Sequence, residues 1–166
     1  MNHDYQWLGL ARIALMRREP GVDYAVSKVP NRLIRDPGLV YERVRWRRKN
    51  RKYDSAIALL GKSSEPRIDA KRWWTERRIL SRWLLRKGRT KEAYALASSH
   101  QQTTGIGRAE GKWLSGWIAL RSLHRYDDAF EHFKEMFENV SYPVSKARAA
   151  YWAGRAAEAG GKPEIS

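Results

Sequence analysis

The chain has 166 residues, a length that suits one ordinary domain or a short stack of small helical repeats. Its 33 Lys and Arg residues outnumber 18 Asp and Glu residues, and the formal net charge of +15 favours an anionic partner such as nucleic acid, acidic lipid or an anionic polymer. Cysteine is absent, which excludes a disulfide framework, a thiolate nucleophile and a cysteine-based zinc site.

The first segment, residues 1–15, does not have the pattern of a signal peptide. A signal peptide has a charged start followed by an uninterrupted apolar run, and this run is interrupted at His3, Asp4, Gln6 and Arg12. No segment of the sequence is long and apolar enough to span a membrane. If the protein is exported, we expect its signal to lie upstream of this sequence.

Apolar residues recur at intervals of three and four along the chain, which predicts helices and not strands. Clear stripes are Trp7, Leu10 and Ala14; Trp113, Trp117 and Leu120; and Phe130, Phe133 and Phe137. Pro and Gly residues between the stripes keep the predicted helices short. A helix stop is predicted at Gly88, and helix starts are predicted at Asp36 before Pro37, at Asp69, at Thr90 and at Asp127.

A repeat of 36 to 37 residues relates three successive segments in the middle and second half of the chain. Trp46 stands ten residues before Ala56, as Trp83 does before Ala93, and Ala129 follows Ala93 by 36 residues. Each unit has a longer helix, a tight basic turn and a second helix with a small residue where it crosses the first. This pattern predicts tetratricopeptide-like helical hairpins, which bury their apolar faces by stacking on one another.

The expected fold is therefore all-α, a right-handed α-superhelix (solenoid) of stacked helical hairpins that forms a single domain over residues 1–166. The helix predicted from about residue 143 to 159 is expected to need a partner helix that would lie beyond Ser166. The approximate repeat units are 1–37, 38–68, 69–106, 107–141 and 142–166, the last of them incomplete.

Arginine stripes are the strongest candidate binding feature. Arginines recur at four-residue spacing in two consecutive repeat units, and like charges at that spacing repel one another on a helix. One interpretation is a solvated outer face, with partial neutralisation by Glu42 and Glu76. The other is a basic lining of the concave surface of the solenoid. The candidate ligand-binding residues are Arg43, Arg47, Arg51, Arg78, Arg82 and Arg86.

Aromatic residues lie among these arginines and offer ring faces that stack on sugars or bases. They are Tyr41, Trp46, Trp73 and Trp74. Their helical spacing favours a place in the core for most of them.

No catalytic, cofactor-binding or metal-binding residue is predicted. His3, His100, His124 and His132 show no pairing at three or four residues, so surface or capping roles are expected for them. Asp127 and Asp128 are explained by helix capping rather than by an acid and base pair.

Four segments together resemble the superhelical region of soluble lytic murein transglycosylases, and the resemblance covers nearly the whole chain. They are residues 36–43 (DPGLVYER), 72–78 (RWWTERR), 116–121 (GWIALR) and 150–159 (AYWAGRAAEA). In that family the helical region forms a curved or ring-like scaffold. A lysozyme-like domain that follows it cleaves the glycan between N-acetylmuramic acid and N-acetylglucosamine and leaves a 1,6-anhydro product.

The resemblance implies a periplasmic location and a role in peptidoglycan metabolism. The family's catalytic glutamate lies in a Glu-Ser segment near a Gly-Leu-Met-Gln motif, and neither occurs here, nor does the Tyr-Tyr-Gly segment that precedes the catalytic domain. No catalytic residue can be carried over. We therefore expect the parent to be a lytic transglycosylase and this part of it to be inactive on its own.

Three function hypotheses remain open. The leading hypothesis is a scaffold that contacts peptidoglycan, whose peptide stems carry carboxylates that arginine holds bidentately, or that positions the missing lysozyme-like domain. The alternative is a tetratricopeptide-like adaptor that binds a protein partner through concave aromatics. Nucleic-acid binding is the third, and it is disfavoured because the arginines belong to no recognisable reader motif.

Overall fold

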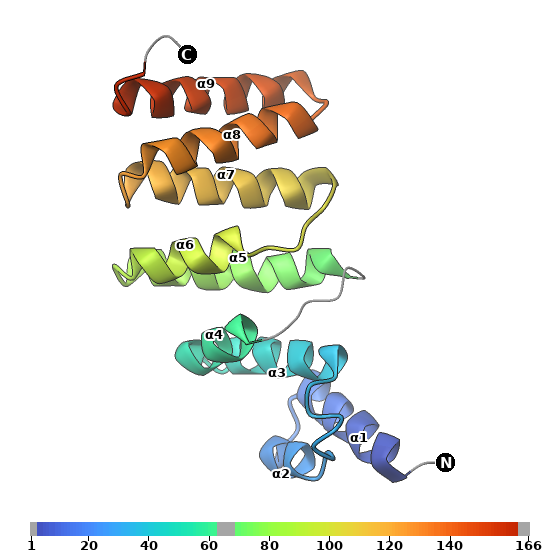
Figure 1. Ribbon diagram of the computed structural model, residues 1–166. Coiled ribbons are helices and arrows are strands. Elements are labelled where there is room, and N and C mark those ends of the chain that lie inside the picture. Colours follow the sequence, from blue (N-terminus) through green and yellow to red (C-terminus); the bar gives the residue numbers. More distant parts are fainter. Residues whose placement is uncertain (1–2, 63–68, 163–166) are drawn as a thin grey trace. The chain divides into compact units, whose positions relative to one another are not determined.

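The computed structural model describes residues 3–62 and 69–162 (Figure 1). These residues form helices and no strand, so the all-α prediction is confirmed for the described ranges. No helix in those ranges combines the length and the apolar character that crossing a membrane requires. The helices are α1 (His3–Arg17), α2 (Val22–Ser27), α3 (Pro37–Lys49), α4 (Tyr53–Gly61), α5 (Ala70–Arg86), α6 (Thr90–Ser98), α7 (Gly105–Arg121), α8 (Tyr126–Asn139) and α9 (Pro143–Ala159).

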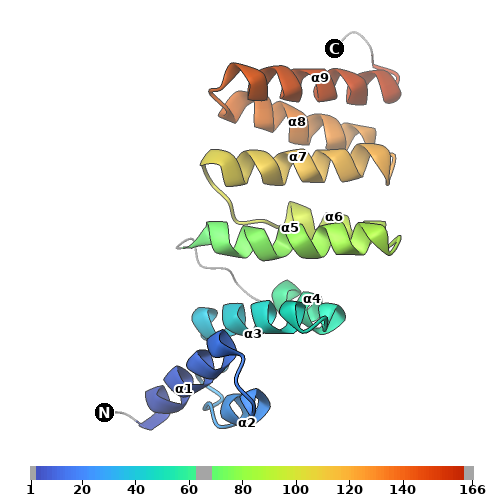
Figure 2. The ribbon, with the colours of Figure 1, turned by 180° about the vertical axis from the view of Figure 1, so that it is seen from behind.

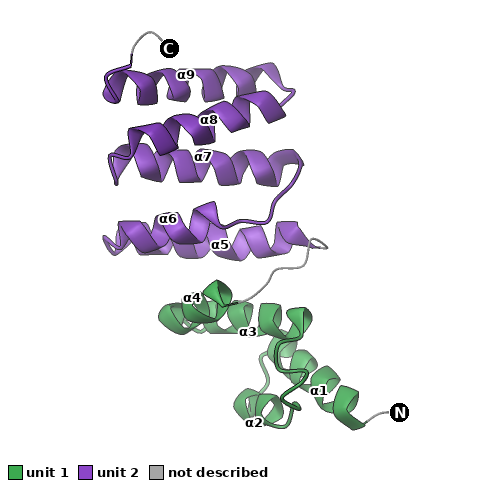
Figure 3. Ribbon diagram, viewed as in Figure 1, with its two compact units in different colours: residues 1–68 green, residues 69–166 purple. Residues whose placement is uncertain are grey.

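The chain divides into two compact units, Met1–Ile68 (unit 1) and Asp69–Ser166 (unit 2) (Figure 3). Each unit has its own packed helices. The finer division into five repeat units stays a prediction.

Unit 1 contains α1 to α4, in which α1 packs on α2 and α3, and α3 packs on α4. Its core consists of small and branched apolar side chains, among them Leu8, Ala11, Leu15, Val22 and Leu39. The stripe predicted on the first helix is partly correct, because Ala14 is buried, Trp7 is half-buried and Leu10 is exposed.

Unit 2 contains α5 to α9, and successive helices run in opposite directions (Figures 1 and 2). Each helix packs on the next along the chain, and α5 also contacts α7. Much of the core lies between α7, α8 and α9, where Ala119, Leu120, Ala129, Phe133 and Ala156 form one cluster. The two stripes predicted in this unit are partly correct: Phe133 and Leu120 are buried, and Phe137 is 41% exposed.

The start of α3 follows the predicted Asp-Pro pair. The Oδ1 atom of Asp36 accepts a hydrogen bond from the backbone N–H of Leu39 at 2.9 Å, and Pro37 occupies the first helical position. The predicted start at Asp69 is also followed by a helix. Asp69, however, has a φ of 63° and its side chain makes no capping hydrogen bond.

The predicted starts of the two shorter helices of unit 2 are correct to within one residue. Helix α6 begins at Thr90, and α8 begins at Tyr126, one residue before Asp127. The capping positions belong to Arg89 and Arg125, neither of which caps through its side chain. Asp127 lies in the first turn of α8 instead, where a carboxylate is stabilised by the positive end of the helix dipole.

A left-handed turn follows each of the helices α1, α3, α5, α7 and α9. At Gly88 the φ is 72°, and the N–H of Arg89 donates to the carbonyl of Leu84 at 3.0 Å, which ends α5 as predicted. Corresponding residues are separated by 37, 36 and 37 positions in the last four turns. The turn residues with positive φ are Arg18, Arg51, Gly88, His124 and Gly161.

Candidate functional site

A cleft of about 660 Å³ opens in unit 2. Its walls come from α5, the first half of α7, the end of α8, the connection after it and the start of α9. Ligand sites of proteins typically span roughly 300–1,000 Å³, so this cleft has the volume of a small-molecule or short-peptide site. We call it the unit 2 cleft.

Arginines dominate the charge of the unit 2 cleft. Arg78 and Arg82 project from α5 and Arg148 from α9, and Glu110 of α7 is the single carboxylate among the lining residues in the described part of the chain. The cleft therefore holds an excess of two positive charges, which favours an anionic ligand.

Glu110 is already engaged within the cleft. Its Oε2 atom accepts a hydrogen bond from Trp74 Nε1 at 2.9 Å and lies 3.4 Å from Arg78 Nη1. The carboxylate thus neutralises Arg78 in part. Arg82 and Arg148, by contrast, make no hydrogen bond or ion pair with any described residue.

Two helix N-termini open toward the same cleft. Gly105 and Ile106 begin α7, and Tyr142 and Ser145 lie at the start of α9. Neither helix has a side chain capping its first turn. The partial positive charge of a helix N-terminus adds to that of the arginines.

The aromatic residues near the predicted arginines are mostly core residues, as their spacing indicated. Trp73 and Trp74 are only 2% and 3% exposed, and Tyr41 is buried. Trp46 is half-buried in unit 1, with the Nζ of Lys52 4.8 Å from its ring centroid. These rings do not offer open faces to a sugar or a base.

Trp113 lines the unit 2 cleft, but its ring is occupied as well. The guanidinium carbon of Arg148 lies 4.0 Å from the ring centroid, and Trp117 stacks with it at 6.4 Å between centroids. The cation–π contact fixes the position of a guanidinium group in the cleft.

The structure separates the six predicted arginines into groups. Arg78 and Arg82 line the unit 2 cleft, whereas Arg86 is exposed near the end of α5 and is not part of its lining. Arg43 and Arg47 are half-buried on α3 of unit 1.

The sequence predicted that Arg51 shares a helix face with Arg43 and Arg47, and this prediction is wrong. Helix α3 ends at Lys49, and Arg51 lies in the left-handed turn with a φ of 61°, so it does not continue the helix face of Arg43 and Arg47. Arg47 Nη1 donates to the carbonyl of Ser55 at 2.9 Å, which is a structural contact between the hairpin helices. Burial, and then the neighbouring Arg47 charge, lowers the pKa of Arg43.

The sequence did not identify Arg148 as a candidate site residue. Arg148 lies in an alanine-rich segment without a run of charges, so it carries no local signal. It joins Arg78 and Arg82 only because α9 packs on α8 and α8 on α7, which places the start of α9 at the cleft.

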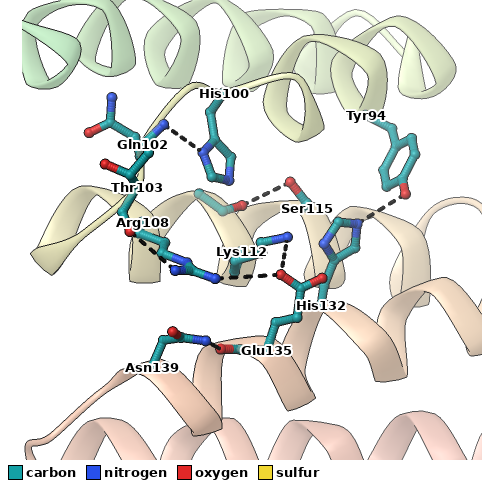
Figure 4. Close-up of polar contacts among 11 residues, drawn as sticks. Tyr94, His100, Gln102, Thr103, Arg108, Lys112, Ser115, His132, Glu135 and Asn139 are labelled. Carbon is teal, nitrogen blue, oxygen red and sulfur yellow. Dashed lines mark hydrogen bonds and ion pairs between the residues drawn. The ribbon is translucent and has the colours of Figure 1, made fainter. Parts of the chain in front are cut away.

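A second polar feature lies between α6, α7 and α8 (Figure 4). Lys112 Nζ lies 2.6 Å from Glu135 Oε2, and Arg108 Nη2 lies 3.9 Å from the same oxygen. The hydroxyl of Tyr94 and His132 Nε2 are 3.0 Å apart and share a hydrogen bond. We call this group the α7–α8 polar cluster. The hydrogen bond from Lys112 lowers the pKa of the Glu135 carboxyl.

His132 of this cluster and nearby His100 are both half-buried, whereas surface or capping roles were expected for them. Burial, followed by the charge of Lys112, lowers the pKa of both His100 and His132 to about 4. His100 Nδ1 accepts a hydrogen bond from the backbone N–H of Gln102 at 3.2 Å. The His132 ring links α8 to α6 through Tyr94, whereas the bond from Gln102 to His100 is local to the connection between α6 and α7.

Comparisons with protein-family models, with curated proteins and with solved structures found no match to this chain. The assignment of function therefore depends on the residues of the unit 2 cleft and on the sequence resemblance.

Proposed function

We propose that this chain is the non-catalytic helical scaffold region of a periplasmic lytic transglycosylase and that it contacts peptidoglycan through the unit 2 cleft. The observation that carries the proposal is the excess of arginine over carboxylate in that cleft. Peptidoglycan is an anionic glycopeptide, and guanidinium groups bind carboxylates with two parallel hydrogen bonds. The scaffold would hold the wall near the lysozyme-like domain of the parent enzyme.

The finer architecture belongs to the same proposal. A right-handed superhelix of tetratricopeptide-like hairpins is supported by the left-handed turns that recur every 36 or 37 residues. It is also supported by the packing of α5 on α6 and of α7 on α8 within unit 2. Hairpins of this kind bury their apolar faces against the next hairpin.

The test is a pull-down on isolated peptidoglycan sacculi across a salt series. We expect the natural chain to bind at low salt and to be released as salt screens the charges. A variant with Arg82→Glu and Arg148→Glu should bind much less. The matched control carries Arg86→Glu and Arg121→Glu, which change the same total charge at exposed positions of unit 2 outside the cleft.

Equal losses in the two variants would assign binding to overall charge and not to the cleft. No binding of the natural chain at low salt would remove the wall-contacting role.

A protein-binding adaptor is the second candidate, and an exposed apolar face in unit 1 favours it. Leu10, Ile13 and Met16 of α1 are 52%, 40% and 47% exposed and recur every three residues on the helix. Exposed apolar patches often mark protein contacts. A saturable protein partner whose binding resists salt and is lost in Ile13→Asp would support this role.

A further inference from the structure

The unit 2 cleft presents two guanidinium groups that no carboxylate of the described chain neutralises. Arg82 is exposed and makes no polar contact with the described residues, whereas Arg148 is held over Trp113 by a cation–π contact alone. Two guanidinium groups that line one cleft repel each other as like charges. A ligand carboxylate would relieve that repulsion.

Helix geometry reinforces the preference for an anion. Helices α7 and α9 are both 17 residues long, and neither has a side-chain cap. The first residues of α7, Gly105 and Ile106, line the cleft; at α9 the lining residues are Tyr142 and Ser145, while Pro143 at the first helical position has no N–H to donate. Backbone N–H groups of an uncapped first turn bind carboxylate oxygens well. These donors are independent of the arginines, so two kinds of anion-binding group meet in one place.

The cleft offers little to a sugar ring by comparison. Sugar binding by stacking needs an open aromatic face, and Trp74 is buried while Trp113 is covered by Arg148. Tyr142, 74% exposed, has the one open ring among the lining residues of the described chain. Asn139, Ser141 and Ser145 line the same cleft with amide and hydroxyl groups. Such groups form hydrogen bonds with the amides of a peptide.

We infer that the unit 2 cleft binds the free carboxylate of a peptide stem of peptidoglycan, with Arg82 and Arg148 as its guanidinium partners and the helix N-termini beside them. The inference rests on the proposed function and names the part of the wall that the scaffold recognises. It assigns the scaffold a selectivity for glycan strands that still carry peptide over strands from which the peptide has been removed.

The experiment is calorimetric titration of the whole chain with three soluble probes. They are a disaccharide-tetrapeptide released from peptidoglycan, the same compound with its carboxylates amidated, and the disaccharide without peptide. We expect the first to bind and the other two to bind at least about tenfold more weakly, the loss expected for one charge-assisted hydrogen bond. The ligand series needs no variant, so it stands even if a variant fails to fold.

The variants then locate the site. The double variant Arg82→Glu, Arg148→Glu should bind the tetrapeptide probe at least about tenfold more weakly than the natural chain. The double variant Arg86→Glu, Arg121→Glu should keep an affinity within about twofold of the natural chain. Circular dichroism of each variant verifies its helix content. An unchanged affinity in the folded cleft variant would overturn the inference.

Other outcomes are equally decisive. If the disaccharide without peptide binds as tightly as the tetrapeptide probe, the cleft recognises glycan. If inorganic phosphate at equal concentration displaces the probe, the cleft is a general anion site. Either result overturns the inference. If sacculi bind but the soluble tetrapeptide probe does not, the inference fails and the wall-contacting function stands. If neither binds, the proposed function fails with it.

Discussion

Gly116 shows at the scale of one residue how closely α7 and α8 approach. A Cβ at this position would lie 2.8, 2.9 and 3.1 Å from ring carbons of Phe133, which is itself completely buried. The ring cannot move aside without displacing the core around it. Glycine is required here by space and not by backbone conformation.

We predict that Gly116→Ala destabilises unit 2 by about 2 kcal/mol, the usual cost of overpacking a core, measured as the free energy of unfolding in urea. The same substitution combined with Phe133→Leu should cost less than the sum of the single changes, because the smaller side chain leaves room for the methyl group. Additive costs would show that the contact with Phe133 is not the cause.

The half-buried histidines predict how stability depends on pH. The pKa of His132 falls from 6.5 to about 4 on folding, so between these values the unfolded chain binds the proton and the folded chain does not. The contribution of His132 to stability should therefore be fully present above pH 6.5 and should be lost progressively as the pH falls from 6.5 to about 4. Below pH 4 this group should cause no further loss. The loss is on the order of 3 kcal/mol at most for one histidine.

The check is the free energy of unfolding measured from about pH 7 to about pH 4 in the natural chain and in His132→Asn. The variant should show a shallower slope, while His124→Asn at an exposed position should keep the natural slope. Because burial also lowers the pKa of His100 to about 4, part of the pH dependence of stability should remain in both variants. Identical slopes in all three proteins would contradict the assignment to His132.

At this scale the sequence predicted part of the candidate site. The four-residue spacing of Arg78 and Arg82 on one helix singled out two residues that do line a cleft. The same spacing failed at Arg51, because the chain leaves the helix before it, and at Arg86, which lies outside the lining. Spacing locates residues on a helix, but tertiary packing decides which of them meet, as Arg148 illustrates.

Among the helices, the left-handed turns make the element boundaries sensitive to single residues. Gly88 has a φ of 72°, a conformation that glycine adopts without steric cost, whereas Arg51 adopts a φ of 61° in the corresponding turn. We predict that Gly88→Ala lowers the thermal stability of the protein by about 1 kcal/mol. Differential scanning calorimetry measures it.

The reverse substitution, Arg51→Gly, should be neutral or stabilising by a few tenths of a kcal/mol to about 1 kcal/mol, because it relieves the left-handed strain. A clear loss of stability in Arg51→Gly would indicate that the arginine side chain makes a contribution larger than the strain. Thus, at corresponding positions of the turn, Gly88→Ala should destabilise the protein and Arg51→Gly should not.

The start of α3 provides a separate prediction. Removing the capping carboxylate in Asp36→Ala should cost about 1 kcal/mol of stability in unit 1, and Asp36→Ser should recover most of it, since both Asp and Ser cap well. Urea unfolding measures both. Equal stability of the alanine and serine variants would show that the bond to Leu39 contributes nothing.

Element starts and stops were largely predictable because capping residues, Pro and Gly act locally. Asp36, Thr90 and Gly88 mark boundaries that the helices do follow. Asp127 was misplaced by one residue, since an acidic residue is favoured both at the cap and in the first turn. Local chemistry does not tell these neighbouring positions apart.

For the whole molecule, the division into two units has a direct consequence. Unit 2 contains its own core cluster and the entire lining of the unit 2 cleft. We predict that residues 69–166 produced alone melt cooperatively and keep the affinity of the full chain for the tetrapeptide probe within about threefold, a change of less than about 1 kcal/mol. Circular dichroism and calorimetry test this. A fragment without helix content would show that unit 2 depends on unit 1.

The packing order in unit 2 also governs how quickly this part of the chain folds. Helices α5 to α9 pack chiefly on their neighbours along the chain, so the loops that must close before contacts form are short. Low contact order of this kind is associated with folding in microseconds to milliseconds. We expect that an adjacent pair, α7 with α8 for example, can act as a folding nucleus and that each further helix then packs on the helices already formed.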